Sequence, residues 1–119
     1  LDCSVDEVES DRLSAARTLA EQFGVTVLLK GRHTILTQAN GAALVNSTGN
    51  VGLAQGGSGD VLAGFIGGVL GQPVFRGREI QAVTYAAWKH GWAADQLTSV
   101  GDYWGMDDLI NALGKREFH

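Results

Sequence analysis

The chain has 119 residues, with nine Lys or Arg against thirteen Asp or Glu, for a formal net charge of −4. This balance excludes a protein that binds nucleic acid without sequence preference, because such proteins neutralise phosphates with clustered cations. A single cysteine excludes an internal disulfide, and no apolar run is long enough to span a membrane, so we expect a cytoplasmic protein without a membrane partner. With 45% hydrophobic residues, the composition predicts one globular unit over residues 1–119.

The beginning of the chain predicts a helix followed by a strand. In residues 9–24 apolar side chains recur at helical spacing, Ser10 stands where an N-cap is preferred, and Gly24 ends the pattern. The apolar, β-branched run at residues 25–29 follows at once, and such a run is typical of a strand buried in a parallel sheet. A helix joined directly to a buried strand indicates an α/β architecture.

A hairpin and two more helices are predicted further along the chain. Strand-like runs at residues 34–38 and 42–46 flank an Asn-Gly pair, and the tolerance of both residues for positive φ predicts a β-hairpin. After a glycine-rich segment, helical patterns predict a long helix over residues 78–97 and a short helix over residues 106–113.

The glycine-rich segment contains an isolated charge, Asp60. Nine of the 17 glycines lie within residues 49–71, and Asp60 is the one Asp, Glu, Lys or Arg among the 43 residues from 33 to 75. It directly follows the Gly-Gly-Ser-Gly run at residues 56–59. If a helix begins near Asp60, its free N–H groups and its dipole stabilise negative charge, and the glycines let the backbone form an anion-binding nest. The segment therefore predicts a phosphate-binding loop, although it matches neither of the common glycine-rich nucleotide fingerprints.

Simpler explanations of these residues stay open. Asp60 can be only an N-cap, and the glycines of the apolar helix can serve close packing alone. We expect His90 to pack or to form a hydrogen bond rather than to catalyse. Trp88, Trp92 and Trp104 are expected to anchor the core or an interface. Three histidines and one cysteine at unrelated spacings predict no metal site.

Several sequence motifs resemble those of one enzyme family. The residues TGNVGLAQGGSGDVLAG at 48–64 resemble the loop signature of ADP-dependent NAD(P)H-hydrate dehydratases, a branch of the ribokinase-like superfamily. The residues VLLKGRHT at 27–34 resemble that family's strand and its K-G-x-x-T nucleotide segment. Residues 85–95 resemble its late helix with a His-Gly-x-Ala-x-Asp pattern. The resemblance implies the C-terminal part of a ribokinase-like three-layer α/β/α fold.

The resemblance also implies an activity and roles for particular residues. Members of this family repair (S)-hydrated NADH or NADPH with ADP or ATP, and Mg²⁺ accompanies the nucleotide. By similarity, Asp60 contacts the hydrated substrate and acts as the base, while residues 30–34 and the glycine-rich loop border the nucleotide. The implied nucleotide-binding residues are Lys30, Gly31, Arg32, His33, Thr34, Asn50, Gly56, Gly57, Ser58 and Gly59.

The chain is less than half as long as the members of this family. Their earlier half supplies central strands, a substrate-contacting segment and acidic groups near magnesium, so we expect activity only as part of a complete enzyme or an assembly. Two alternatives stay open: a small-molecule kinase of the same superfamily, in which Asp60 deprotonates an alcohol, and a truncated nucleotide-binding or assembly module without catalysis. The helix predicted after Asp60 is apolar on every face and must be covered, which predicts a homo-oligomer or association with another chain.

Overall fold

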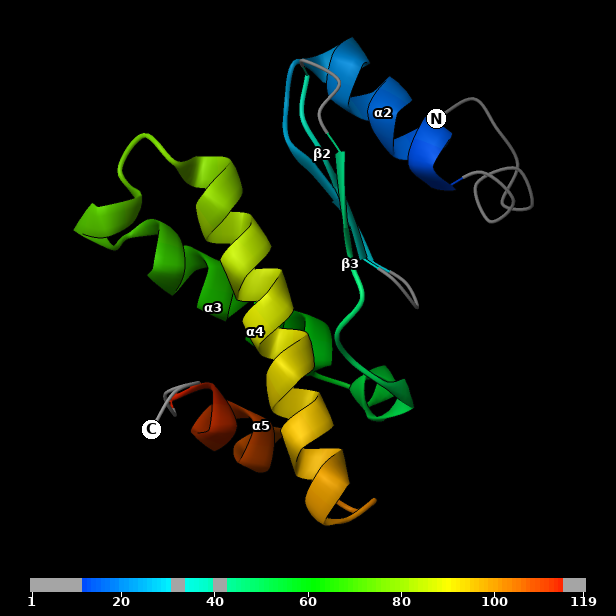
Figure 1. The fold of residues 1–119 in the computed structure, drawn as a ribbon, viewed down its shortest axis with the longest axis vertical. Coiled ribbons are helices and arrows are strands. Elements are labelled where there is room, and N and C mark those ends of the chain that lie inside the picture. Colours follow the sequence, from blue (N-terminus) through cyan, green and yellow to red (C-terminus); the bar gives the residue numbers. More distant parts are fainter. Residues whose placement is uncertain (1–11, 31–33, 40–42, 115–119) are drawn as a thin grey trace. The chain divides into compact units, whose positions relative to one another are not determined.

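The computed structural model describes residues 12–30, 34–39 and 43–114. The chain divides into two compact units, residues 1–46 and 47–119, and each has its own helices and its own buried residues (Figure 1). The prediction that residues 1–119 form a single unit stays a prediction. Among the described helices, none is both long and apolar enough to cross a membrane.

The 1–46 unit packs one helix against a small sheet (Figure 1). Its elements are α2 (Arg12–Phe23), β1 (Val27–Leu29), β2 (Thr34–Thr37) and β3 (Ala43–Asn46). The helix buries Ala16 and Ala20, whose small side chains allow close approach to the sheet, and the Thr37 hydroxyl donates to the Ala16 carbonyl at 3.0 Å. At Gly24 the backbone is left-handed (φ 64°), so the chain turns into the sheet where the sequence predicts the helix to end. The N-cap expected at Ser10 lies outside the described residues.

The sheet is an antiparallel meander in the order β1-β2-β3. Val27 pairs with Thr37 across β1 and β2, and Thr34 pairs with Asn46 across β2 and β3. The predicted hairpin is thus confirmed, but the parallel pairing predicted for the run at residues 25–29 is wrong for these strands. The reason is the connection: only four residues join β1 to β2, whereas a parallel pair needs a crossover of about a dozen or more. Nor is β1 fully buried, since all three of its residues are partly exposed.

The 47–119 unit is helical, and α4 runs through it as the longest element (Figure 1). Its elements are the short 3₁₀ helix η1 (Val51–Ala54), α3 (Ser58–Leu70), η2 (Pro73–Phe75), α4 (Glu79–Val100) and α5 (Met106–Leu113). Both α3 and α5 pack against α4, and α5 has the bounds predicted for it. One apolar cluster joins the end of α4 to α5 around Leu109, and another joins α3 to the beginning of α4 around Val69.

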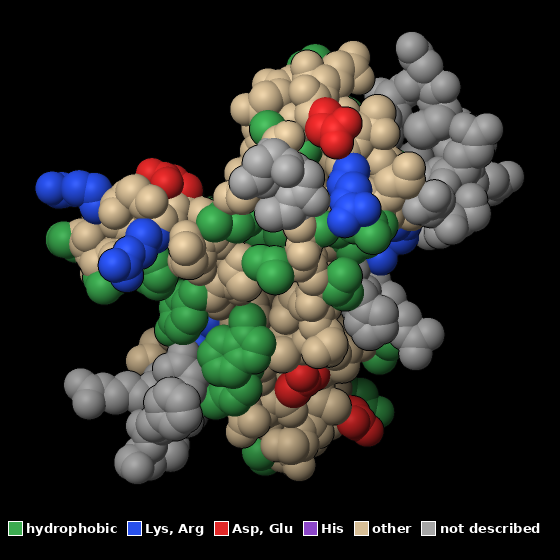
Figure 2. Space-filling view, turned by 45° about the horizontal axis from the view of Figure 1, so that its top comes forward, with side chains coloured by type: hydrophobic (Ala, Val, Ile, Leu, Met, Phe, Trp, Pro, Cys, Tyr) green, Lys and Arg blue, Asp and Glu red, His purple; other side chains and the backbone are tan. Residues whose placement is uncertain are grey.

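The predicted apolar helix, α3, is covered on only part of its surface. Leu62 and Val69 are buried, whereas Gly64, Gly67 and Leu70 are exposed. Hydrophobic side chains also reach the surface elsewhere, as Figure 2 shows for one face of the molecule. Because an apolar helix with an exposed side is unfavourable in water, this exposure supports the expectation that further protein surface covers α3.

Candidate functional site

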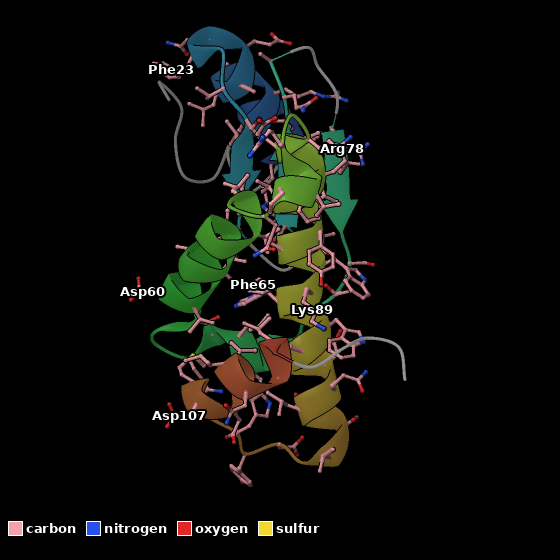
Figure 3. All side chains as sticks on the ribbon, turned by 90° about the vertical axis from the view of Figure 1, so that its left-hand side faces the viewer. Phe23, Asp60, Phe65, Arg78, Lys89 and Asp107 are labelled. Atoms are coloured by element: carbon pink, nitrogen blue, oxygen red, sulfur yellow. The ribbon has the colours of Figure 1, made fainter. Side chains whose placement is uncertain are left out.

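The glycine-rich loop leads directly into α3 and places Asp60 in the first turn of this helix. The helix begins at Ser58, two residues earlier than the sequence suggests, and its N-cap is Gly57. Gly57 has a left-handed backbone (φ 94°), which explains why a glycine stands there. Asp60 is therefore not the N-cap, and no side-chain capping bond is formed at this end of α3. Its carboxylate is exposed and, in Figure 3, points away from α3 and α4.

The backbone at the start of α3 presents N–H groups that the helix itself does not use. The first bond of the helical ladder runs from the Val61 N–H to the Gly57 carbonyl at 3.0 Å. The Ser58 N–H turns back to the Gln55 carbonyl at 3.3 Å, so the N–H groups of Gly59 and Asp60 precede the ladder. A β-carbon built at Gly56 has no heavy atom within 4 Å, so the space beside the loop is open. Unused donors, the positive end of a helix and open space suit a bound phosphate.

A carboxylate of α4, Asp95, holds the beginning of the same loop. One oxygen of Asp95 accepts the backbone N–H of Gly49 at 3.0 Å, and the other accepts the side-chain amide of Asn50 at 2.9 Å. The carbonyl oxygen of the Asn50 side chain accepts the Gly52 N–H at 2.8 Å and so caps η1. The two ends of the Asn50 amide are thus both engaged within the protein.

Two further residues of α4, His90 and Gly91, contact the loop one turn before Asp95. The His90 Nε2 lies 3.2 Å from the Ser58 carbonyl, which requires the proton on that nitrogen if a hydrogen bond is formed. His90 is only 6% exposed, so the expectation of a packing or hydrogen-bonding histidine is confirmed. A β-carbon at Gly91 would lie 2.6 Å from the carbonyl carbon of Thr48 and would also collide with the Thr48 hydroxyl. Glycine is the residue that allows this approach.

The indole of Trp104 supports the loop from the segment that precedes α5. A β-carbon at Gly52 would lie 2.6 Å from Cζ2 of Trp104, and the Trp104 N–H donates to the Thr98 hydroxyl at 3.0 Å. The ring also packs against the apolar cluster around Leu109. The core role expected for this tryptophan is therefore confirmed.

The other predicted nucleotide segment lies in the 1–46 unit. Lys30 directly follows β1 and is exposed, and Thr34 begins β2. Gly31, Arg32 and His33, the residues between them, lie outside the described residues. Lys30 and Thr34 thus flank the connection between β1 and β2, an antiparallel strand pair.

The histidine, cysteine, aspartate and glutamate side chains within the described ranges form no group of three or more that could hold a metal ion. A Mg²⁺ ion that travels with a nucleotide does not need such a group, because it is commonly bound through one or two carboxylates and the substrate phosphates. Asp60 is the carboxylate in the first turn of α3, beside the N–H groups that precede the helical ladder.

Asp95 lies in the motif at residues 85–95, but the sequence predicts no role for it. The contacts join residues 45 and 46 positions apart, so local patterning contains no sign of them. A usable signal was present in the motif itself: a glycine inside a helix is costly, and Gly91 stands between a histidine and an aspartate on such a helix.

Comparison with known proteins identifies the family of the chain. The sequence model of the Carb_kinase family, described as NAD(P)H-hydrate dehydratase, matches residues 1–113. The chain belongs to the NAD(P)H-hydrate dehydratase family. Within that family it is 45% identical, over 99 residues, to the ADP-dependent (S)-NAD(P)H-hydrate dehydratase of Neisseria meningitidis serogroup B. It is 41% identical, over 115 residues, to the bifunctional NAD(P)H-hydrate repair enzyme Nnr of Escherichia coli K12.

Solved structures of dehydratase-family proteins share the fold. The Bacillus subtilis protein YxkO, described as a putative kinase, matches 93% of this chain with a TM-score of 0.84 and 30% identity. The ADP/ATP-dependent NAD(P)H-hydrate dehydratase of the same organism, co-crystallised with ATP and Mg²⁺, matches 92% with a TM-score of 0.82 and 31% identity. The predicted fold class, the C-terminal part of a ribokinase-like α/β fold, is therefore confirmed.

The dehydratase-family chain spans only part of its relatives. It covers 32% of the Neisseria dehydratase and 22% of the Escherichia enzyme, and 41% and 39% of the two Bacillus structures. The recognised resemblance, including its restriction to a C-terminal portion, is confirmed.

Proposed function

We propose that this chain forms the C-terminal portion of an ADP-dependent (S)-NAD(P)H-hydrate dehydratase and acts within a complete enzyme. One observation carries the proposal: the carboxylate of Asp60 is exposed in the first turn of α3 and forms no capping bond there, and it lies beside N–H groups that the helix leaves unused. A base beside an anion-binding backbone suits a reaction in which a hydroxyl receives a phosphoryl group and is then eliminated. The names of the relatives, which act on NAD(P)H hydrate, agree with this chemistry.

In this proposal Asp60 orients the hydroxyl of the hydrated nicotinamide and takes its proton. Phosphoryl transfer has a loose transition state, so positioning and late proton removal suffice. The nucleotide, ADP or ATP with Mg²⁺, supplies the phosphoryl group. Residues 56–59 border the phosphates, to which Gly59 and Asp60 present N–H groups, Asn50 belongs to the same loop, and residues 30–34 border the rest of the nucleotide.

We also propose a cytoplasmic location and association with further protein surface, from a second copy or from the rest of a complete enzyme. The single cysteine and the need of the reaction for soluble nucleotides support the location. The exposed side of α3 and the exposed large apolar residues support the association.

The decisive experiment compares Asp60→Asn with Asp107→Asn in the complete enzyme, assayed with Mg²⁺, ADP and hydrated NADH. Asp107 is a matched control, because it is also an exposed aspartate in the first turn of a helix, α5 (Figure 3). We expect Asp60→Asn to lower kcat by about two to four orders of magnitude, as loss of a general base does, with little change in stability. Asp107→Asn should leave kcat unchanged.

A variant Asp60→Asn that retained more than about a tenth of the parental turnover would contradict the proposed role, since general-base catalysis contributes more than that. Thermal shift with ADP provides an independent measurement. A ligand that binds only the folded protein raises its stability, so an unchanged melting temperature at saturating ADP would argue against a nucleotide site.

A further inference from the structure

Three residues of α4, His90, Gly91 and Asp95, contact the loop that precedes α3 near both of its ends. We propose that Asp95 is a positioning residue of the phosphate-binding loop, and that Asn50 serves the loop by transmitting this hold rather than by contacting the nucleotide. This inference rests on the proposed function, because it assigns the means by which the phosphate loop of that function is held.

The hydrogen bonds of Asp95 form a connected path into the loop. Its two oxygens accept donors from adjacent residues, the Gly49 N–H at 3.0 Å and the Asn50 amide at 2.9 Å. The Asn50 side chain continues the path to the Gly52 N–H at 2.8 Å. Bonds to a carboxylate are stronger than neutral ones, and the partial burial of Asp95 limits competition from water.

Between Gly49 and Gly52, apolar side chains of the loop contribute little to its position. The side chain of Val51 is 93% exposed, so it contributes almost no apolar burial to the position of the loop. Gly49 itself has a left-handed backbone (φ 106°), and glycine has no intrinsic preference for this conformation over those with negative φ. The polar path from Asp95, together with the Trp104 ring against Gly52, therefore fixes the direction of the chain between Gly49 and Gly52.

The far end of the loop is fixed from the same helix. His90 lies with Nε2 at 3.2 Å from the Ser58 carbonyl, in the first turn of α3, and Gly91 lets Thr48 approach the helix backbone. The helix α4 thus contacts Thr48, Gly49 and Asn50 at one end of the loop and Ser58 at the other. Holding both ends on one element keeps the loop, and the N–H groups of Gly59 and Asp60 that directly follow it, in a fixed arrangement, which is what a preorganised anion site requires.

The test uses the complete enzyme with three variants: Asp95→Asn, Asn50→Asp and the double exchange of both. In Asp95→Asn, the new side-chain NH₂ faces either the Gly49 N–H or the Asn50 amide, and two donors cannot bond. In Asn50→Asp, the carboxylates at positions 50 and 95 repel each other. In the exchange, the new amide at position 95 donates to the new carboxylate at position 50 and still accepts the Gly49 N–H, while that carboxylate accepts the Gly52 N–H. Every bond of the path is retained, and the bond between positions 50 and 95 alone reverses its direction.

We expect each single variant to weaken ADP binding by about tenfold or more, since a hydrogen bond to a charged group is worth at least that factor. The exchange should recover most of the lost affinity, and Asp102→Asn, at an exposed aspartate beyond α4, should change nothing. Hydrogen–deuterium exchange should become faster in peptides that cover residues 47–58 for Asp95→Asn, without a change in α5.

Three results would each overturn the inference. In the first, Asp95→Asn binds ADP as tightly as the parental enzyme; in the second, the double variant binds ADP as weakly as the single variants. In the third, hydrogen–deuterium exchange rises equally in the loop and in α5. If the parental enzyme bound no ADP, the proposed function would fail instead. The hydrogen-exchange comparison would then decide the role of Asp95 alone, because it needs no nucleotide.

Discussion

A methyl group added to Gly91 tests how closely the loop approaches α4. Gly91 lies inside this long helix, where alanine in place of glycine ordinarily stabilises by about 1 kcal/mol. At this position the new β-carbon would lie 2.6 Å from the carbonyl carbon of Thr48 and 2.7 Å from its oxygen. Both are backbone atoms, so neither can rotate away, and the loop and the helix must separate. The usual stabilisation by alanine is therefore expected to reverse.

The size of the effect follows from three contributions. Forcing a methyl group into a packed site costs about 1–3 kcal/mol. The separation also weakens the hydrogen bond from the Thr48 hydroxyl to the Trp88 carbonyl, now 2.9 Å, which contributes about 0.5–1.5 kcal/mol. Against these stands the gain of about 1 kcal/mol in helix propensity. The net result is a loss of about 2 kcal/mol in the free energy of unfolding, within the range that these contributions allow.

Urea unfolding followed by circular dichroism measures this loss for Gly91→Ala against Gly101→Ala. Gly101 has extended backbone (φ −178°) and no atom within 4 Å of a built β-carbon, so its alanine variant should be neutral or slightly stabilised. The midpoint of Gly91→Ala should fall while its m-value stays unchanged. If Gly91→Ala is as stable as the parent or more stable, the close approach of Thr48 to α4 is refuted.

Two further predictions concern the loop and the assembly. Gly59→Ala should weaken ADP binding more than Ser58→Ala in calorimetry, because a methyl group at Gly59 stands beside the unused N–H groups whereas the Ser58 side chain is 5% exposed; equal affinities would argue against a phosphate at this helix end. At micromolar concentration, multi-angle light scattering of the 119-residue chain should give the mass of a dimer or larger assembly, with an interface towards about 2,000 Å². A compact monomer that binds no hydrophobic dye would contradict this.

Local patterns predicted the elements of this fold better than their pairing. The helix over residues 106–113 and the hairpin were foreseen because apolar periodicity and an Asn-Gly pair are local signals. The run at residues 25–29 was assigned to a parallel sheet because its composition suits a buried strand, but composition does not specify the partner. The four-residue connection that follows it decides the direction, and loop length was the evidence to weigh.

In the candidate site, too, local features could be predicted from the sequence and long-range contacts could not. Asp60 stands out because an isolated charge among glycines is visible in the sequence, and a helix does begin near it. The helix starts at Ser58, two residues before Asp60, because Gly57 takes a left-handed conformation there. Asp95 received no role because its partners, Gly49 and Asn50, lie about 45 residues earlier in the chain. Long-range hydrogen bonds of this kind follow from the packing of α4, and Gly91, a costly glycine inside a helix, is the local sign of that packing.

The position of Trp104 gives the loop an optical reporter of its own. Its indole lies against Gly52, so a displaced loop would change the solvent around the ring and shift its fluorescence emission. The other two tryptophans, Trp88 and Trp92, stack with centroids 6.1 Å apart, and the ammonium of Lys89 lies 4.2 Å from the centre of the Trp92 ring. That pair belongs to the middle of α4. With phenylalanine at those two positions, the tryptophan fluorescence of this chain would come from the edge of the loop that leads into α3.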